Sequence, residues 1–490
     1  MRINMFHRGL MAGTALLIAS CAQSPSKNIN TEFNSVTIDK VFKDIKDDTP
    51  GCILGVIKDG ALVFQKGYGL ANLEHSIPIT TDTVFRIAST SKQFTAMSTI
   101  ILAEEGQISL DDNIRKYVPE MPDYGKIITI RNLINHTSGI RDFLTLFFLK
   151  GFKDQDYYTE VEFLEMLARQ KELDFTPGEK MSYSNSGYIL QSIIIQRVTG
   201  KTLAEYAKEK IFDPLKMKNT HFHNDIKHLV KNRAYGYWPD KKGGYNVGGT
   251  PQELIGDGGV FTTIADLALY DLDFYEGKVW RPAVKEQMIT PGVLNDGSPA
   301  AFFPDIFYAG GLIIGKQRGL PYVRHAGQFA GFITDFIRFP EQKLSVTALC
   351  NGGDLDAVGF TGKVSDIFLE SHYIEAKSSQ EKETTEKQVN QKKISSETLN
   401  AISGKYYNSD LDVIYKIVKN GKTFDLLIGK RPTKITFEEL NLPVFDLGDD
   451  VLGNEYIKIK IIRDKEGQVT ALNFTDFSVV KNLYFERVNK

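Results

Sequence analysis

Four serines of this sequence are followed by a lysine three positions later, at Ser24, Ser89, Ser379 and Ser478. A serine hydroxyl becomes a useful nucleophile only when a neighbouring base removes its proton, and an uncharged lysine amine can act as that base. Residues three positions apart share one face of a helix, so this spacing places the two groups side by side wherever a helix carries it. The surroundings of each serine therefore decide which pair could do chemistry.

Only Ser89-Thr90-Ser91-Lys92 stands at the start of an expected amphipathic helix. Residues 89–105 place Phe94, Met97, Ile101 and Leu102 on one face, and Gly106 ends the pattern. The serines at 24 and 379 lie in polar stretches, and the one at 478 lies among expected strands near the chain end. A helix start also offers free N–H groups to a developing oxyanion. Taken alone, Ser89 could still be a simple N-cap with Lys92 in solvent.

Two later segments add polar groups of the right chemistry. Tyr183-Ser184-Asn185 lies where a turn leads into a helix expected around residues 188–198, so it would present a phenol and an amide from one loop. Arg324-His325-Ala326-Gly327 precedes a strand-rich stretch. The G-x-S-x-G motif of α/β-hydrolases does not occur in the sequence, which disfavours that class.

The order S-x-x-K, Y-x-N and H-x-G resembles the serine β-lactamase and D,D-peptidase superfamily, in its class C-like branch. The segments 85–88, 135–139 and 256–260 are also similar to that branch, and the resemblance covers roughly residues 37–370. The last part of the chain, opening with Gly404-Lys405-Tyr406-Tyr407, is similar to accessory domains of D-aminopeptidase-like and esterase-like members.

The resemblance implies a role for each matching residue. Ser89 would be the acylated nucleophile, and Lys92 and Tyr183 would be its base and acid, in an order that the sequence leaves open. The implied substrate-binding residues are Asn185, His325, Gly327 and Gln328. The backbone N–H groups of Ser89 and Gln328 would form the oxyanion hole. No cofactor or metal is implied.

His325 departs from the β-lactamase pattern, which usually has Lys at this place. Histidine has a pKa near 6.5 in water and is mostly neutral at pH 7. The triplet therefore weakens the case for an efficient β-lactamase. We expect the charged form of His325 to help hold a substrate carboxylate as the pH falls.

Other residues invite a chemical interpretation. His136, in Asn135-His136-Thr137-Ser138-Gly139, suggests a Ser-His pair, but a turn explains that segment better. His221 and His223, with Asp225 and His228, have a loosely metal-like spacing in a polar, loop-like region, where a solvated surface is the simpler explanation.

The remaining patterns predict an α+β fold followed by an all-β domain. Strand patterns at both ends of residues 37–372, with helices between them, indicate an antiparallel sheet flanked by helices, and the resemblance adds a helical subdomain. Residues 373–397 are polar and read as a linker. Residues 398–490 show short alternating strands and a hairpin around Asn420-Gly421, typical of a small barrel or sandwich.

The N-terminus reads as an export signal. Residues 1–20 combine a basic start with a short apolar run, and Cys21 follows as in a bacterial lipobox. We expect Cys21 to be lipidated, residues 21–36 to be a tether, and the protein to face the periplasm or cell surface as an exported lipoprotein. Cys52 and Cys350 lie in apolar strand-like runs, where two buried, unpaired thiols are favoured over a disulfide.

The expected function is that of a serine hydrolase acting on D-amino-acid peptides or amides, small esters or β-lactams. Its substrate would be a small molecule or a peptide such as a peptidoglycan fragment, and its membrane contact would be the lipid anchor. The formal net charge of −2 gives no electrostatic reason to bind nucleic acid. The alternative is a penicillin-binding sensor or scaffold that is acylated but does not turn over.

Overall fold

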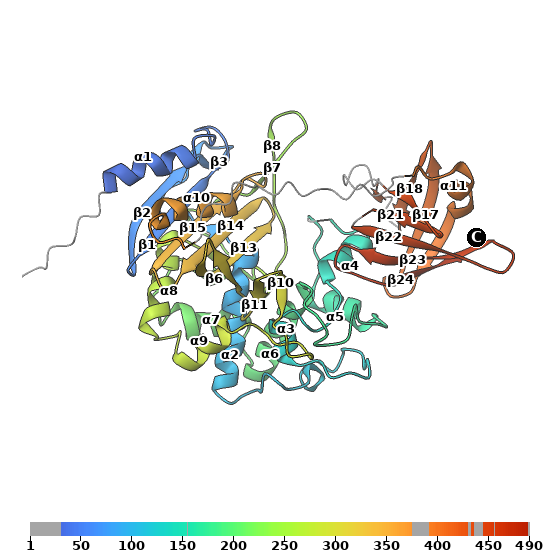
Figure 1. Cartoon of the computed structure of the whole chain (residues 1–490), viewed down its shortest axis with the longest axis horizontal. Helices are drawn as coiled ribbons and strands as arrows, with labels where there is room; N and C mark the ends of the chain where they lie inside the picture. Colours follow the sequence, from blue (N-terminus) through green and yellow to red (C-terminus); the bar gives the residue numbers. More distant parts are fainter. Residues whose placement is uncertain are drawn as a thin grey trace, which may run out of the picture.

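The computed structural model of the 490-residue chain describes residues 31–153, 155–374, 392–429, 433–435, 444–454 and 456–488. Within these ranges the chain forms two large antiparallel sheets with helices packed mainly around the first (Figure 1). The helices are α1 Thr31–Val41, α2 Lys92–Glu104, α3 Ile130–Ile134, α4 Phe143–Leu149, α5 Glu160–Ala168, α6 Ser186–Thr199, α7 Leu203–Ala207, α8 Ile264–Glu276, α9 Pro282–Ile289, α10 Ala357–Leu369 and α11 Ser396–Ile402. Shorter helical turns are η1 Ala88–Ser91, η2 Ile114–Lys116 and η3 Lys208–Phe212.

The first sheet has eight strands in the order β10-β11-β12-β13-β14-β15-β1-β2. Their bounds are β1 Cys52–Lys58, β2 Ala61–Tyr68, β10 Ala301–Phe303, β11 Ile306–Tyr308, β12 Ile313–Gln317, β13 Leu320–Phe329, β14 Phe332–Phe339 and β15 Leu344–Cys350. The predicted hairpin at the start of the chain is confirmed, because β1 pairs with β2 through Asp59 and Gly60, both with positive φ. That turn geometry matches the natural twist of a hairpin.

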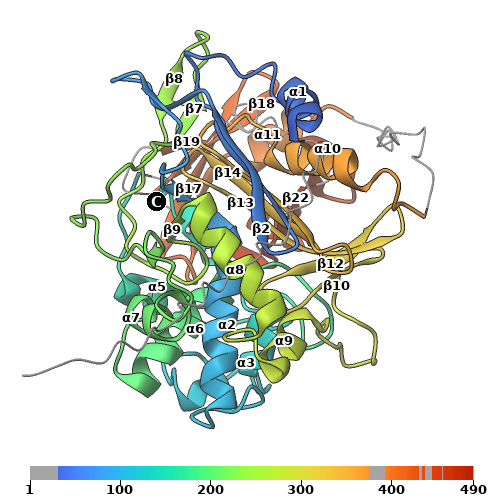
Figure 2. The same ribbon diagram turned by 90° about the vertical axis from the view of Figure 1, so that its left-hand side faces the viewer.

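Helices cover both faces of this sheet, which confirms the α+β class. The strand β1 is buried on both sides: Cys52, Leu54 and Val56 belong to the apolar cluster under α1 and α10, while Ile53 and Ile57 belong to the other cluster. On that second face lie α8 and the helical region around α2 (Figure 2). Alternate side chains of a strand point to opposite faces, so a strand buried on both sides is apolar throughout.

Several short strands complete this part of the chain and hold the loops around α2. They are β3 Leu70–Asn72, β4 Ile77–Pro78, β5 Phe85–Arg86, β6 His221–Phe222, β7 Tyr237–Pro239, β8 Tyr245–Val247 and β9 Val260–Thr262. The strand β9 pairs with β5 and with β6, so it ties the segment before Ser89 to the middle of the chain.

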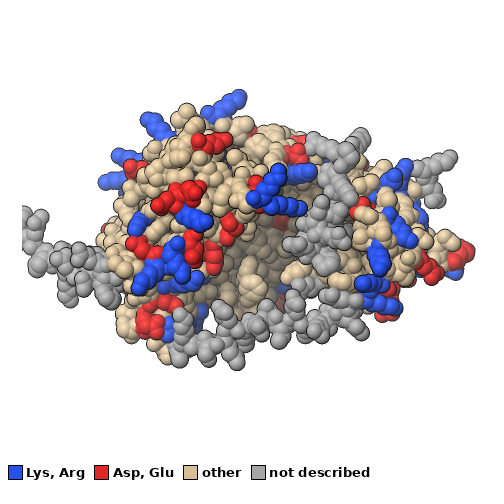
Figure 3. Space-filling view, turned by 90° about the horizontal axis from the view of Figure 1, so that it is seen from above, with Lys and Arg blue, Asp and Glu red and all other residues tan. Residues whose placement is uncertain are grey.

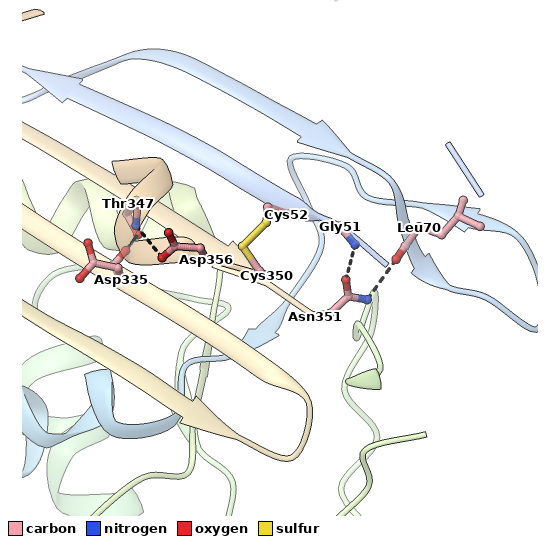
Figure 4. Close-up of a disulfide and its surroundings, with 9 residues drawn as sticks. Gly51, Cys52, Leu70, Asp335, Thr347, Cys350, Asn351 and Asp356 are labelled. Carbon is pink, nitrogen blue, oxygen red and sulfur yellow. Dashed lines mark hydrogen bonds between the residues drawn. A yellow bond between two sulfur atoms is a disulfide. The ribbon is translucent and has the colours of Figure 1, made fainter. Parts of the chain in front are cut away.

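The two strand cysteines form a disulfide, and the favoured prediction of unpaired thiols is wrong (Figure 4). Cys52 and Cys350 lie directly opposite each other on neighbouring antiparallel strands, with Cα atoms 4.0 Å apart. The next residue, Asn351, accepts from the Gly51 N–H at 2.8 Å and donates to the Leu70 carbonyl at 3.0 Å. The disulfide therefore depends on the register between β1 and β15, whose cysteines are 298 residues apart in the chain.

The second sheet has nine strands in the order β19-β18-β17-β16-β24-β23-β22-β21-β20. Their bounds are β16 Gly404–Asn408, β17 Val413–Asn420, β18 Thr423–Ile428, β19 Thr433–Ile435, β20 Phe445–Gly448, β21 Val451–Gly453, β22 Ile457–Arg463, β23 Val469–Phe477 and β24 Leu483–Val488. It is one curled sheet, so of the two predicted shapes the structure favours the barrel over the sandwich (Figure 1). The predicted hairpin at Asn420-Gly421 joins β17 to β18.

Buried contacts join the second sheet to the helical region of the first. Arg141 is almost fully buried and lies 3.1 Å from Asp410 of the second sheet and 3.5 Å from Asp174 of the first part. The Tyr415 hydroxyl donates to the Leu149 carbonyl at 2.6 Å. The two parts therefore share a buried ionic contact, in addition to apolar packing.

Charged side chains are spread over the surface. Blue and red residues alternate on the face seen in Figure 3, without one large patch of either sign. This agrees with the formal net charge of −2. Among the helices of the described residues, none is long and apolar enough to cross a bilayer.

Candidate active site

Ser89 lies in a tight turn between strand β5 and helix α2. Ala88 has a φ of 47°, a left-handed conformation that costs a residue with a side chain some energy and is often retained at functional sites. The 3-10 turn η1 follows, and α2 continues from it, so the helix predicted from Ser89 is present with a tightened first turn. The Thr90 hydroxyl donates to the His325 carbonyl at 3.2 Å, which holds this turn against β13.

Gly327 makes the close approach of β13 to this turn possible. A side chain at position 327 would place its Cβ 2.8 Å from the Ser89 nitrogen and 2.5 Å from the Ile87 carbonyl oxygen. Any larger residue would force the strand away from the serine. The next residue, Gln328, is exposed and lines the same cavity as Ser89.

Lys92 is fully buried and points at Ser89. Its Nζ lies 3.2 Å from Ser89 Oγ, 2.8 Å from Asn185 Oδ1 and 2.6 Å from the Asp257 carbonyl oxygen. Burial lowers the pKa of Lys92 to about 8, against the opposite influence of the Asp257 and Asp142 carboxylates. About a tenth of this amine is therefore uncharged at pH 7, far more than for a lysine in water, and the uncharged form is the one that can act as a base for Ser89.

Tyr183 stands over the same pair. Lys92 Nζ is 4.9 Å from the centre of the Tyr183 ring. Burial raises the pKa of Tyr183 well above its usual value, and its contact with the Ser89 hydroxyl acts in the opposite direction. The phenol is therefore a proton donor at physiological pH.

Asn185 owes its orientation to a residue that the sequence analysis did not single out. Its backbone N–H and its side-chain Nδ2 both donate to Asp142 Oδ2, at 2.7 and 2.9 Å. The opposite end of the amide, Oδ1, is then left to accept from Lys92. Asp142 also caps α4 by accepting from the Thr145 N–H at 3.0 Å. An N-cap aspartate before an apolar run was the available sequence signal, but it pointed to a helix start and not to a site.

His325 lies in the cavity, but its charge differs from our expectation. Burial lowers its pKa to about 3, and the nearby Lys92 acts in the same direction. Nδ1 lies 2.5 Å from the Ala326 carbonyl oxygen and must donate to it, while Nε2 lies 3.1 Å from the Tyr308 hydroxyl. With its pKa lowered to this extent the ring stays neutral near pH 6.5, which argues against the titration of a carboxylate-binding imidazolium there.

His136 supports the site from behind. Its ring packs 4.2 Å from that of Tyr183 and 4.5 Å from that of Tyr308, and its Nδ1 accepts from the Ser184 N–H at 3.1 Å. Burial lowers its pKa well below the usual value. It has contacts with Tyr183 and not with Ser89, which fits the structural interpretation of this segment.

The candidate metal ligands do not form a metal centre. His221 Nε2 and His223 Nδ1 lie 3.2 Å apart and hydrogen-bond each other. Within the ranges that the structure describes, no group of three or more His, Cys, Asp or Glu residues has a metal-binding arrangement.

A cavity of about 580 Å³ opens over the nucleophile. Ser89, Tyr183, Asn185, His325, Gly327 and Gln328 all line it, so the structure brings the predicted site residues to one place, with Lys92 buried directly beneath Ser89. Much of the rest of the wall is apolar, including Phe143, Leu144, Leu254 and Phe302. Arg86 and Asp257 add two charged groups that the sequence analysis did not assign.

Comparison with known proteins gives consistent relatives. Penicillin-binding protein 4* of Bacillus subtilis is 28% identical over 344 residues, covering 67% of this chain and 72% of that protein. A D-aminopeptidase of Cereibacter sphaeroides is 28% identical over 307 residues, covering 62% of this chain and 57% of that protein, a little over half of its length. The octameric penicillin-binding protein homologue from Pyrococcus abyssi superposes with a TM-score of 0.61 at 25% identity, over 94% of this chain and 100% of that one.

The profile of the Beta-lactamase family matches residues 38–362, which is well over half of the chain. The match contains both the turn that carries Ser89 and the strand that carries His325. Motif order, fold and site geometry agree with it. The chain therefore belongs to the Beta-lactamase family.

Proposed function

We propose that the protein is a serine hydrolase that forms an acyl-enzyme on Ser89 and acts on amides or peptides of D-amino acids. The observation that carries the proposal is the 3.2 Å contact between Ser89 Oγ and the buried amine of Lys92. The D-aminopeptidase relative supports the substrate class. A hydrolase of small esters would use the same site, and the experiment below separates these substrates.

In the proposed reaction, Lys92 takes the proton of Ser89 while Oγ attacks the substrate carbonyl carbon. The N–H groups of Ser89 and Gln328 stabilise the resulting oxyanion. Tyr183 donates its proton to the leaving nitrogen, the carbon–nitrogen bond breaks, and the proton now on Lys92 restores Tyr183. Lys92 is the better first base because burial lowers its pKa to about 8 and raises that of Tyr183.

A water molecule then completes the cycle. It gives a proton to the same base, attacks the ester carbon and releases the acid, while Ser89 regains its proton. Asn185 holds Lys92 in place throughout, because Asp142 fixes its amide. Efficient release of the acyl group distinguishes a hydrolase from a protein that is only acylated.

The test is intact-mass detection of the acyl-enzyme with a penicillin, a D-alanyl-D-alanine peptide, a D-amino-acid amide and a short ester. We expect Ser89→Ala to abolish labelling and turnover of every compound. Ser91→Ala is the matched control, because its hydroxyl faces away and accepts from the Val260 N–H at 3.1 Å. Wild-type labelling of the Ser89→Ala protein would refute the assignment of the nucleophile.

The same experiment also tests the alternative function, a penicillin-binding sensor or scaffold. A penicillin adduct that persists, without turnover of any other compound, would identify a penicillin-binding sensor or scaffold. The similarity to penicillin-binding protein 4* is the observation that keeps this candidate open. Rapid loss of the adduct and accumulation of product would identify the hydrolase.

We also propose that the protein is exported and lipid-anchored at Cys21, which lies outside the described residues. The basic start, the short apolar run and the lipobox-like ending of residues 1–20 support this. Cys21→Ser should move the protein from the detergent phase to the aqueous phase in phase partitioning. Unchanged partitioning would contradict the anchor.

A further inference from the structure

Arg86 is a buried cation in the wall of the Ser89 cavity. Its relative exposure is 4%, and it lies on the short strand β5, three residues before the nucleophile. Strand β5 pairs with β9, where Arg86 is opposite Phe261. The guanidinium carbon lies 5.7 Å from the centre of the Phe261 ring and 5.2 Å from that of Phe329.

The other buried arginines show what Arg86 lacks. Arg141 has carboxylates of Asp174 and Asp410 within ion-pair distance, and Arg338 has Asp271 at 2.7 Å. Throughout the described part of the chain, Arg86 has neither an ion pair nor a hydrogen bond from its Nε. A buried guanidinium without a close ion pair is costly, so a carboxylate bound directly to Arg86 would be favourable.

The guanidinium keeps its charge in this position. Burial lowers the pKa of Arg86 to about 10, and the carboxylate of Asp257 acts in the opposite direction. At neutral pH the side chain is therefore cationic. Asp257 lines the same cavity, and its backbone carbonyl accepts from Lys92. Burial raises the pKa of the Asp257 carboxyl group, and both Lys92 and Arg86 act to lower it.

We propose that Arg86 binds a carboxylate of the substrate, and that it, rather than His325, selects anionic substrates. The inference rests on the proposed function and names the substrate class: amides or peptides of D-amino acids that carry a free carboxylate. A planar guanidinium matches a carboxylate with two parallel hydrogen bonds. His325 is neutral and hydrogen-bonded to Ala326 and Tyr308, and Lys92 is buried beneath Ser89 as its base. Arg86 is the one lysine or arginine among the described residues that line the cavity.

The carboxylate could belong to the leaving group or to the acyl group, and two substrate pairs separate these cases. The first pair is a D-alanyl-D-alanine dipeptide and the same dipeptide with a C-terminal amide. The second pair is a succinyl and an acetyl D-alanine anilide. We expect the carboxylate member of one pair to have the lower KM by about ten- to hundred-fold, the scale of a hydrogen-bonded charge pair.

Arg86→Gln should remove that preference by raising KM for the carboxylate member, while the neutral member changes little. Arg86→Lys should restore part of it. Arg233→Gln is the matched control: this guanidinium carbon lies 4.9 Å from the centre of the same Phe261 ring, but Arg233 is not among the described residues that line the cavity, so the preference should persist. An equal rise of KM for both members would show a structural role and overturn the proposal.

Asp257→Asn supplies an independent prediction. Removal of the negative charge that acts on Arg86 should lower KM for the carboxylate member further, whereas a role of Asp257 as the receptor for a substrate ammonium would raise KM for both members alike. The second outcome would contradict the proposal.

Binding measured by calorimetry on the Ser89→Ala protein keeps this inference separate from the proposed function. The carboxylate member should bind more tightly than its neutral twin even if the wild-type protein never turns over. Equal affinity of the twins would overturn the role of Arg86, whereas tight carboxylate binding without turnover would overturn only the hydrolase assignment. The same comparison needs no Arg86 variant, so it stands if Arg86→Gln fails to fold.

Discussion

Asp142 sets both the orientation of Asn185 and part of the electrostatic field at Lys92. Its carboxylate acts to raise the pKa of Lys92, against the effect of burial. Two hydrogen bonds through the Asn185 amide, of 2.8 and 2.9 Å, connect the two charges. Asp142→Asn removes the negative charge and keeps a helix-capping side chain, since Asn caps as well as Asp.

The size of the effect follows from the separation. The two hydrogen bonds and the amide between them put the two charges at most about 8 Å apart, so at an effective dielectric constant of about 20 the lost attraction is about 2 kcal/mol, or about 1.5 pH units. Lys92 must be uncharged to accept the proton of Ser89. The acylation rate should therefore rise with pH through about 8 in the wild-type protein. In the variant that rise should occur about 1.5 pH units lower.

The assay is kcat/KM for a neutral ester between about pH 5 and pH 10 at constant ionic strength, since a neutral substrate does not titrate. The plateau should also fall, because an Asn at position 142 no longer fixes the Asn185 amide. Asp266→Asn is the control. Asp266 is equally buried, but its carboxylate accepts from Asn219 and Thr220 and is not among the charges that act on the pKa of Lys92. A rise that stays near pH 8 in Asp142→Asn would refute the reasoning.

Three further predictions concern other parts of the molecule. Lys92→Ala and Tyr183→Phe should each slow acylation by about 10² or more, and the double variant should lose much less than the product of both, as rapid-quench kinetics would show. Replacing Cys52 and Cys350 by Ser should lower the free energy of unfolding by about 3–5 kcal/mol, because the disulfide closes a very long loop; unchanged denaturant midpoints would contradict this. His325→Gln should leave the pH dependence of KM unaltered between about pH 5 and pH 8, since His325 is already neutral there; loss of an inflection near pH 6.5 would show otherwise.

Local spacing in the sequence predicted that Ser89 and Lys92 could lie side by side, whereas the roles of Tyr183 and Asn185 followed from the resemblance to the family. Ser89 and Lys92 share a helix face at fixed spacing, and the turn after Pro177 delivers Tyr183 and Asn185 to the same cavity. The hairpins at Asp59-Gly60 and Asn420-Gly421 were equally readable, because Asp59, Gly60 and Gly421 accept the positive φ that such turns need. The Ser89–Lys92 spacing and the two hairpins depend on neighbours within a few residues, whereas the meeting of Asn185 with Lys92 joins residues 93 positions apart.

The features that escaped prediction depend on distant contacts. The disulfide depends on the register between β1 and β15, whose cysteines are 298 residues apart in the chain. The low pKa of His325 depends on its burial in the folded protein. Asp142 is 43 residues from Asn185 in the chain, so its hydrogen bonds exist only after α4 and α6 pack. The sequence around Arg86 is that of an ordinary strand, and only the structure shows that its side chain is buried with an Nε that has no hydrogen-bond partner among the described residues.

The buried contact between Arg141 and Asp410 means that truncating the chain between its two sheets should destabilise the first part. A chain shortened to the family-matching part would keep Arg141 buried beside Asp174 but without the second carboxylate and without the Tyr415 contact at Leu149. Removing one partner of a buried ionic network costs about 3–5 kcal/mol, a large share of a typical domain's stability. Arg141 precedes Asp142, the residue that orients Asn185. The C-terminal sheet thus stabilises the segment that carries Arg141 and Asp142 in the wall of the site. We therefore expect the full chain to be more stable than its family-matching part alone.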